Sequence, residues 1–218
     1  MIAQLDHLTA VIVGGILLLA LFAVQQRSAT HAAEVTLTQA ARVHADAVLE
    51  VVADDVENLL TPAQAIAALG RSDLRLTAVD GRTLEAVLTT NVRTDTTGAN
   101  GRSPFQPATV TYTLTPTHRT RLGADSVDVF RLDRTVALAA GMETATLGEV
   151  VDFDVAFVGR GARVEAGTPD ASAMTEAAIS LAVAADVPLS RSHDQTSTRE
   201  ALVHAAATVR PVNATATL

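Results

Sequence analysis

The chain has 218 residues, which allows one domain of ordinary size with an extension but not two large domains. It contains no Cys, and this excludes disulfides, thiolate metal sites and a cysteine nucleophile. All 16 basic residues are Arg, so Schiff-base and P-loop chemistries that depend on Lys are excluded too. The net charge of −8 argues against a nucleic-acid partner held through its phosphates.

The first element is an apolar segment, residues 8–24, which reads LTAVIVGGILLLALFAV and carries no charge. Its length is near the lower limit for crossing a bilayer, and Ala3 or the pair Gln25 and Gln26 can extend it through the interface. We expect a retained membrane anchor. A cleaved secretory signal is the alternative, but no basic residue precedes the run and no small-x-small site closes it before Arg27.

The charges that flank this segment bear on its orientation. Asp6 precedes it, whereas Arg27, His31 and Arg42 follow it. Taken alone, the positive-inside rule places the large C-terminal part in the cytoplasm. A basic leader ahead of the present sequence would reverse this orientation and place that part outside.

An amphipathic helix is expected to continue the apolar segment, because no Pro or Gly occurs between Gly15 and Pro62. One helix from about Ala3 to Leu60 would be roughly 85 Å long. Its second half has an apolar face suited to cover a sheet. The residues of that face are Leu37, Ala41, Ala45, Val48, Val52, Val56 and Leu59. We therefore divide the chain into an N-terminal helix, 1–61, and a β-rich globular domain, 62–218.

A short helix is expected over 62–69, with Pro62 in its first turn and Gly70 as its stop. From Asp73 onward the apolar residues alternate with polar ones, which is typical of half-buried strands. The dipeptide Asp80-Gly81 predicts a hairpin turn. Strands are expected at 74–78, 84–92, 109–114, 127–132, 134–138, 150–158, 177–184 and 202–209. The fold class is therefore α+β, a long helix packed on an antiparallel sheet or small sandwich.

Few residues suggest catalysis. His193 and Asp194 lie in a polar stretch with Ser190 and Ser192, but no nucleophile-elbow motif is present, so a solvated turn is the favoured interpretation. No two His have metal-ligand spacing, which argues against a metalloenzyme.

Two further stretches that contain aspartate need neither a catalytic nor a metal-binding explanation. Asp152 and Asp154 share one strand face, where alternation alone explains them as its wet side. Asp95 and Asn100 lie in a Gly-rich stretch that lacks the dense carboxylates of a Ca²⁺ site. We expect no catalytic residue, metal, cofactor or small-molecule substrate.

The segment Ile2 to Gly14 resembles the mature start of type IV pilins and type II secretion pseudopilins. In that family an apolar or aromatic residue and a Thr-Leu-Ile-Glu-like stretch precede a long apolar run. Here Asp6 takes the place of the family's glutamate. A helix that continues well past the membrane is a second family feature.

The C-terminal half resembles the larger minor pilins and the J-type minor pseudopilins. The order of its motifs carries this resemblance: a V-x-Y-x-L strand, a Leu/Arg segment, a V-x-F-x-V-x-F strand, a small-residue strand and a closing V-x-x-R-N-like strand. The matching pieces are Val110–Leu114, Arg131–Arg134, Val151–Phe157, Ile179–Val183 and Val209–Asn213.

The resemblance implies a structural subunit of a filament or secretion pseudopilus, without enzymatic activity. Its partners would be copies of itself or other pilin-like subunits. It would rest in a bacterial inner membrane before assembly, and then occupy the periplasm or a cell-surface filament. The residues expected in the filament core are Asp6, Leu8, Gly14, Gly15, Leu17, Leu18, Leu21 and Phe22.

Two features of that core have physical reasons. A carboxylate at Asp6 is costly in an apolar core unless it pairs with a neighbour's charged amino terminus, which would also fix the axial register. A plain interfacial residue at the membrane edge is the alternative interpretation of Asp6. Gly14 and Gly15 would let helices approach closely or allow the helix to unwind locally on extraction from the membrane.

Two other functions remain open from the sequence. One is a single-pass anchored β-domain that binds another envelope protein without polymerising. The other is a membrane-tethered hydrolase whose activity would depend on His193 or Asp194.

Overall fold

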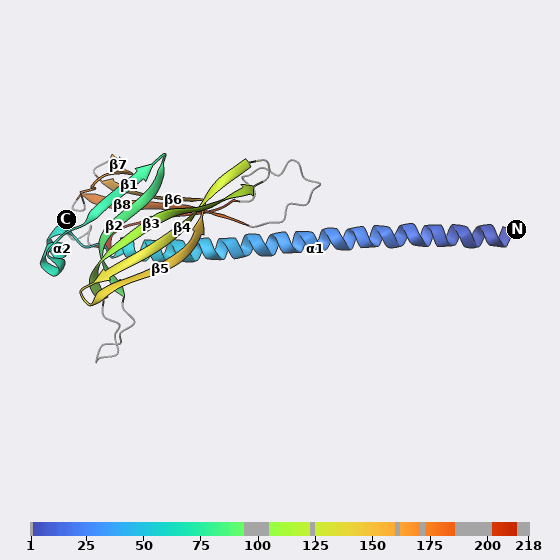
Figure 1. The fold of residues 1–218 in the computed structure, drawn as a ribbon, viewed down its shortest axis with the longest axis horizontal. Helices are drawn as coiled ribbons and strands as arrows, with labels where there is room; N and C mark the ends of the chain where they lie inside the picture. Colours follow the sequence, from blue (N-terminus) through green and yellow to red (C-terminus); the bar gives the residue numbers. More distant parts are fainter. Residues whose placement is uncertain are drawn as a thin grey trace.

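One long helix and a β-rich domain make up the protein (Figure 1). The computed structural model describes residues 2–93, 105–122, 125–159, 162–170, 173–185 and 202–212, without the side chains of 2–10, 121, 122 and 125. Helix α1 is continuous over Ile2–Glu57, 56 residues, which corresponds to a length of about 84 Å. Its first half extends away from the domain, and its second half lies against the sheets (Figure 1).

The strands form two antiparallel sheets. The first is a five-stranded meander in the order β1 (Leu74–Val79), β2 (Arg82–Arg93), β3 (Phe105–Leu122), β4 (Asp125–Leu138) and β5 (Gly141–Val150). The second has four strands in the order β7 (Ala162–Val164), β6 (Asp152–Gly159), β8 (Met174–Ala184) and β9 (Leu202–Val209). The expected α+β class, a long helix packed on antiparallel sheet, is confirmed.

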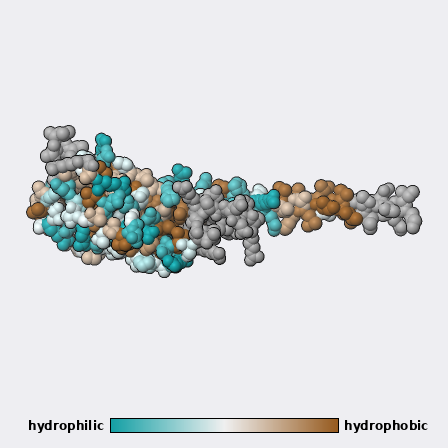
Figure 2. All heavy atoms as spheres, turned by 90° about the horizontal axis from the view of Figure 1, so that it is seen from above, coloured by the Kyte–Doolittle hydropathy of each residue, from teal (hydrophilic) through white to brown (hydrophobic). Residues whose placement is uncertain are grey.

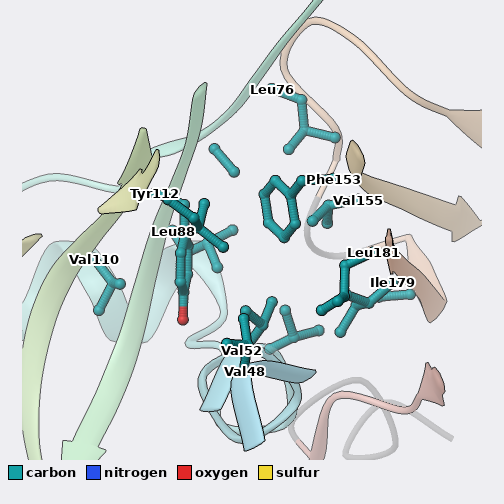
Figure 3. Close-up of a cluster of buried hydrophobic side chains, with 14 of the residues drawn as sticks. Val48, Val52, Leu76, Leu88, Val110, Tyr112, Phe153, Val155, Ile179 and Leu181 are labelled. Atoms are coloured by element: carbon teal, nitrogen blue, oxygen red, sulfur yellow. The ribbon is translucent and has the colours of Figure 1, made fainter. Parts of the chain in front are cut away.

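The core is enclosed by the two sheets and the second half of α1. Val48 and Val52 project from the helix into the space between Tyr112 of the first sheet and Ile179 of the second (Figure 3). Farther from the helix, Leu76 on β1 forms a bridge with Gly167, in the segment that follows β7 of the second sheet. The helix therefore closes the open side of a two-sheet wedge.

Local signals explain the connections. Helix α2 (Pro62–Leu69) starts with a capping box between Thr61 and Gln64, and it ends at Gly70, whose φ of 73° suits glycine. The turn between β1 and β2 places Asp80 at φ 52° and Gly81 at φ 73°, as a two-residue hairpin turn requires. Both features match the sequence expectation.

Several strand predictions were wrong, and the short strand β7 was not expected. The strand expected to end at residue 114 runs on to Leu122, because a register shift after Pro116 accommodates the proline. Residues 127–132 and 134–138 form one strand, since Asp133 points outward to Arg131 and Thr146 and does not break the ladder. Strand β5 was missed because it is an exposed edge strand without apolar alternation.

The core can be tested at Phe153, which is 1% exposed and packs against the ring of Tyr112. We expect Phe153→Ala to lower the free energy of unfolding by about 3–5 kcal/mol, because it leaves a cavity between the sheets. The measurement is urea unfolding of the full chain in detergent, followed by the near-ultraviolet circular dichroism of Tyr112, the single Tyr of the chain.

Phe105→Ala is the matched control, because Phe105 is 55% exposed. Its effect should stay within about 0.5 kcal/mol. Equal effects of the two substitutions would contradict this description of the core.

Candidate functional site

The candidate site is the apolar first half of α1. From Val11 to Val24 every residue is exposed, although the side chains are almost all apolar. Figure 2 shows this part of the helix as a brown rod that stands clear of the domain. It is the one described helix long and apolar enough to cross a membrane, and none of its most apolar stretch is buried. Such a surface requires lipid or other apolar helices around it.

The structure places the predicted assembly residues on this rod. Leu17, Leu18, Leu21 and Phe22 are between 57% and 69% exposed. A side chain added at Gly14 or Gly15 would meet nothing within 4 Å, so no contact among the described residues requires glycine there. Asp6 and Leu8 belong to α1, but their side chains lie outside the described residues.

The predicted helix-to-sheet residues lie at the other end of α1. Val48, Val52 and Val56 are buried in the core. Leu59 is buried too, just beyond the last residue of the helix. Ala41 is half-buried and packs against the core, and Leu37 is half-buried above it.

A buried ion pair fastens α1 to the first sheet. Asp55, only 2% exposed, lies on the core side of the helix. Arg134 on β4 donates two hydrogen bonds to its carboxylate, from Nε at 2.7 Å and from Nη2 at 2.8 Å. The Tyr112 hydroxyl on β3 donates a third, and Thr90 on β2 donates to the Asp55 carbonyl at 2.7 Å. Side chains on three strands of the first sheet thus donate hydrogen bonds to one residue of the helix.

This cluster changes the acidity of its members. Burial raises the pKa of the Tyr112 phenol well above its usual value, and the negative charge of Asp55 raises it further. For Arg134, burial works against the charge, but the hydrogen bond to Asp55 and the attraction of its carboxylate outweigh this and raise the pKa. Arg134 therefore stays charged and Tyr112 stays neutral across the physiological range.

Sequence reasoning missed this cluster, yet a signal was present. Val48, Val52, Asp55 and Leu59 are spaced 4-3-4, so Asp55 falls within the apolar face as its single charge. A carboxylate inside a core needs a cation. What the sequence did not supply was the strand register that sets Tyr112 directly opposite Arg134.

The residues considered above for catalysis or metal binding either bond to other side chains or lie outside the described residues. Asp152 pairs with Arg82, and Asp154 accepts a hydrogen bond from Thr83 and pairs with Arg163. Asp154 is more enclosed than a wet strand face would make it, since its side chain is 16% exposed. The triad candidates 190–194 and the loop residues 95–100 lie outside the described residues. The described part of the chain contains no group of three or more His, Asp or Glu arranged to hold a metal.

Comparison with known proteins adds little. No protein-family model matches the chain, and no curated protein matches its sequence. A type IV-like pilin from Thermus thermophilus is similar in structure, with a TM-score of 0.40 and 14% sequence identity, over 84% of this chain and 97% of that one. Because this TM-score is below 0.5, neither fold nor function is inferred from the likeness.

The ion pair predicts a large effect at one of two adjacent aspartates. Asp55→Asn leaves the half-buried Arg134 without its counter-charge and the Tyr112 hydroxyl without its carboxylate acceptor, so we expect a loss of about 3–5 kcal/mol in the free energy of unfolding. Asp54→Asn, one residue away on the exposed face, should change it by less than about 0.5 kcal/mol. Urea unfolding measures both, and equal small effects would show that the pair does not secure the helix.

The raised pKa of Tyr112 predicts loss of stability in alkali. Because the phenol is neutral in the folded state, its contribution is complete below the unfolded pKa of about 10 and declines as pH rises above it. As the single Tyr, it alone gives tyrosinate absorbance near 295 nm. The folded chain should show none at pH values where the urea-unfolded chain is fully ionised. Identical titration curves for the two states would contradict the buried assignment.

Proposed function

We propose that this protein is a pilin-like structural subunit that polymerises through its N-terminal helix into an extracellular filament or secretion pseudopilus. The subunit rests in the inner membrane as a single-pass protein with the β-domain outside, the orientation that a basic leader ahead of the present sequence would set. On assembly, the apolar first half of α1 leaves the lipid and bundles with the same segment of other subunits. Its partners are further copies or other pilin-like subunits.

The observation that carries this proposal is the continuity of α1. A protein that needs only a tether can use a flexible linker between anchor and domain. Here no Gly or Pro interrupts the helix between Gly15 and Glu57, and its second half is an integral wall of the core. The domain is thereby held at a fixed distance and orientation from the apolar segment. Such rigidity is useful where many copies must stack in one regular arrangement.

Asp6 and the paired glycines have roles in this arrangement. Asp6 would pair with the charged amino terminus of a neighbouring subunit, since a lone carboxylate in an apolar bundle is costly. Gly14 and Gly15, where an added side chain would meet nothing within 4 Å in the described part of the chain, would allow neighbouring helices to approach closely.

The alternative is a single-pass β-domain that binds another envelope protein without polymerising. It requires the same apolar surface but only one copy in the membrane. Electron microscopy of material sheared from cells that produce the protein separates the two, together with mass spectrometry of the intact N-terminus. Filaments that contain this chain support the proposal. A chain found only in the membrane fraction, without filaments, overturns it. A chain that begins after residue 24 shows a cleaved signal and overturns it too.

Asp6→Asn tests the proposed charge pair. The substitution preserves shape and apolar context, so the chain should still enter the membrane. We expect the yield of filaments to fall by about tenfold or more, because one lost buried pair exceeds the 1.4 kcal/mol that corresponds to tenfold.

Asp46→Asn, on the exposed part of α1 beside the domain, is a control for the loss of one helical carboxylate. Unchanged filament yield with Asp6→Asn would assign this residue to the membrane edge and remove it from the assembly mechanism.

A further inference from the structure

Strand β5 leaves one edge of the first sheet open. It pairs with β4 on one side, and within the described part of the chain no strand, loop or side chain bonds the backbone groups on its other side. Residues 141–146 are all exposed and keep a regular antiparallel register with β4. Alternate N–H and C=O groups of this stretch therefore point to solvent and offer a template for another strand.

The other sheet edges are covered or short. On β1, the N–H and the C=O of Leu76 each bond to the backbone of Gly167 at 2.8 Å. In the second sheet, β9 lies against α1, and β7 has only three residues. Beside β7, the Thr83 hydroxyl accepts a hydrogen bond from the Val155 N–H of β6 at 3.0 Å. Among the described strands, β5 is thus the exception to the usual protection of edges.

The composition of β5 does not protect its edge either. Residues 141–147 contain no Pro and no basic residue, and Glu143 is their single charge. The register shift that could bend the strand away lies beyond Thr146. Met142 is 75% exposed, more than any other large apolar side chain in the described residues. A regular, nearly uncharged edge with an exposed apolar side chain is suited to pairing with another chain.

We propose that the free edge of β5 pairs with β5 of a second copy, antiparallel and centred on Thr144. Two copies supply identical unpaired edges, so each can satisfy the backbone groups of the other. The contact is isologous, which means that the same residues meet in both directions. Met142 lies opposite Thr146, and Thr144 lies opposite its own copy. Glu143 lies opposite Ala145, so no like charges face each other.

The centre of the contact follows from the neighbours of Thr144. A contact centred on Glu143 would set two carboxylates directly opposite each other, which is unfavourable. A contact centred on Ala145 would involve Leu147, which packs against the core, and would extend into the irregular part of the strand. Centring on Thr144 keeps the pairing within the regular, exposed stretch.

The contact reverses the direction of the second copy. Its two-fold axis is perpendicular to the sheet, and α1 runs alongside the sheet, so the two α1 helices point in opposite directions (Figure 1). Subunits in one membrane or one filament point the same way and cannot make this contact. It therefore joins subunits of opposite polarity, such as those of two filaments that lie side by side. The inference goes beyond the proposed function, because it needs no contact between N-terminal helices.

Cross-linking of the full chain in detergent tests the pairing, because the chain has no Cys of its own. Thr144→Cys should give a covalent dimer on mild oxidation, since opposite Cα atoms of an antiparallel pair lie about 4.5–5.5 Å apart, within the reach of a disulfide. Met142→Cys and Thr146→Cys should each stay monomeric, but a mixture of the two should give the heterodimer. No dimer from Thr144→Cys, or dimers from either of the other two variants alone, would overturn the inference.

A lysine at the edge tests the same contact by repulsion. Added to both members of that mixture, Thr144→Lys sets two cations together at the two-fold axis and should lower the yield of heterodimer about tenfold. Thr113→Lys is the matched control, because Thr113 is exposed on β3, which has a strand on each side. It should leave the yield unchanged, and equal yields with the two lysine variants would contradict the contact. The Tyr112 spectrum checks that each variant folds.

Filaments separate this contact from the proposed function. Where the wild-type chain forms filaments, Thr144→Lys should form them in the same amount. Loss of the filaments themselves would place β5 in a contact inside the filament and overturn the inference. If the wild-type chain forms no filaments, the proposed function fails, and the cross-links still decide the β5 contact.

Discussion

The packing of α1 between the two sheets is the constraint on which the other features of the protein depend. Without the helix, the wedge formed by the sheets would expose the apolar side chains that now meet Val48 and Val52. The Asp55–Arg134 pair then fixes which turn of the helix faces which strand. A slip along the axis would leave a buried charge unpaired. The ion pair therefore sets how far the apolar half of α1 extends beyond the domain.

Much of this arrangement could be predicted from the sequence where the signals are local. The long helix follows from the absence of Gly and Pro after Gly15, and α2 follows from Thr61-Pro62 and Gly70. The hairpin at Asp80-Gly81 follows from backbone conformation alone. These elements depend on residues close together in the chain, so a single sequence is sufficient to find them.

The features that sequence reasoning missed are set by strand pairing and packing, which the local pattern of apolar and polar residues does not reveal. Strand β5 has almost no apolar alternation, and it pairs because β4 offers an edge. The sheet-to-sheet crossing at Val150 and Val151 is set by packing on both sides. The pairing of Asp55 with Arg134 spans 79 positions and needs the β3–β4 register, which sequence periodicity does not define. The candidate assembly segment and its continuous helix were found from the sequence, whereas the ion pair that fixes this helix against the first sheet required the structure.

The second half of helix α1 has a buried face and, opposite it, an exposed face. One face packs in the core, where Val48 and Val52 are buried. The other face is exposed and presents small side chains such as Ala40 and Ala47. In the proposed function the buried half of the helix fixes the domain, and the apolar half associates with other subunits.

The most direct test of this account is a high-resolution electron microscopy reconstruction of the filaments that contain this chain. The account predicts a core of parallel α1 helices, with residues 8–24 bundled at the centre and the β-domains outside. A filament whose contacts are made by the β-domains alone, with the apolar segments still in the membrane, would contradict it.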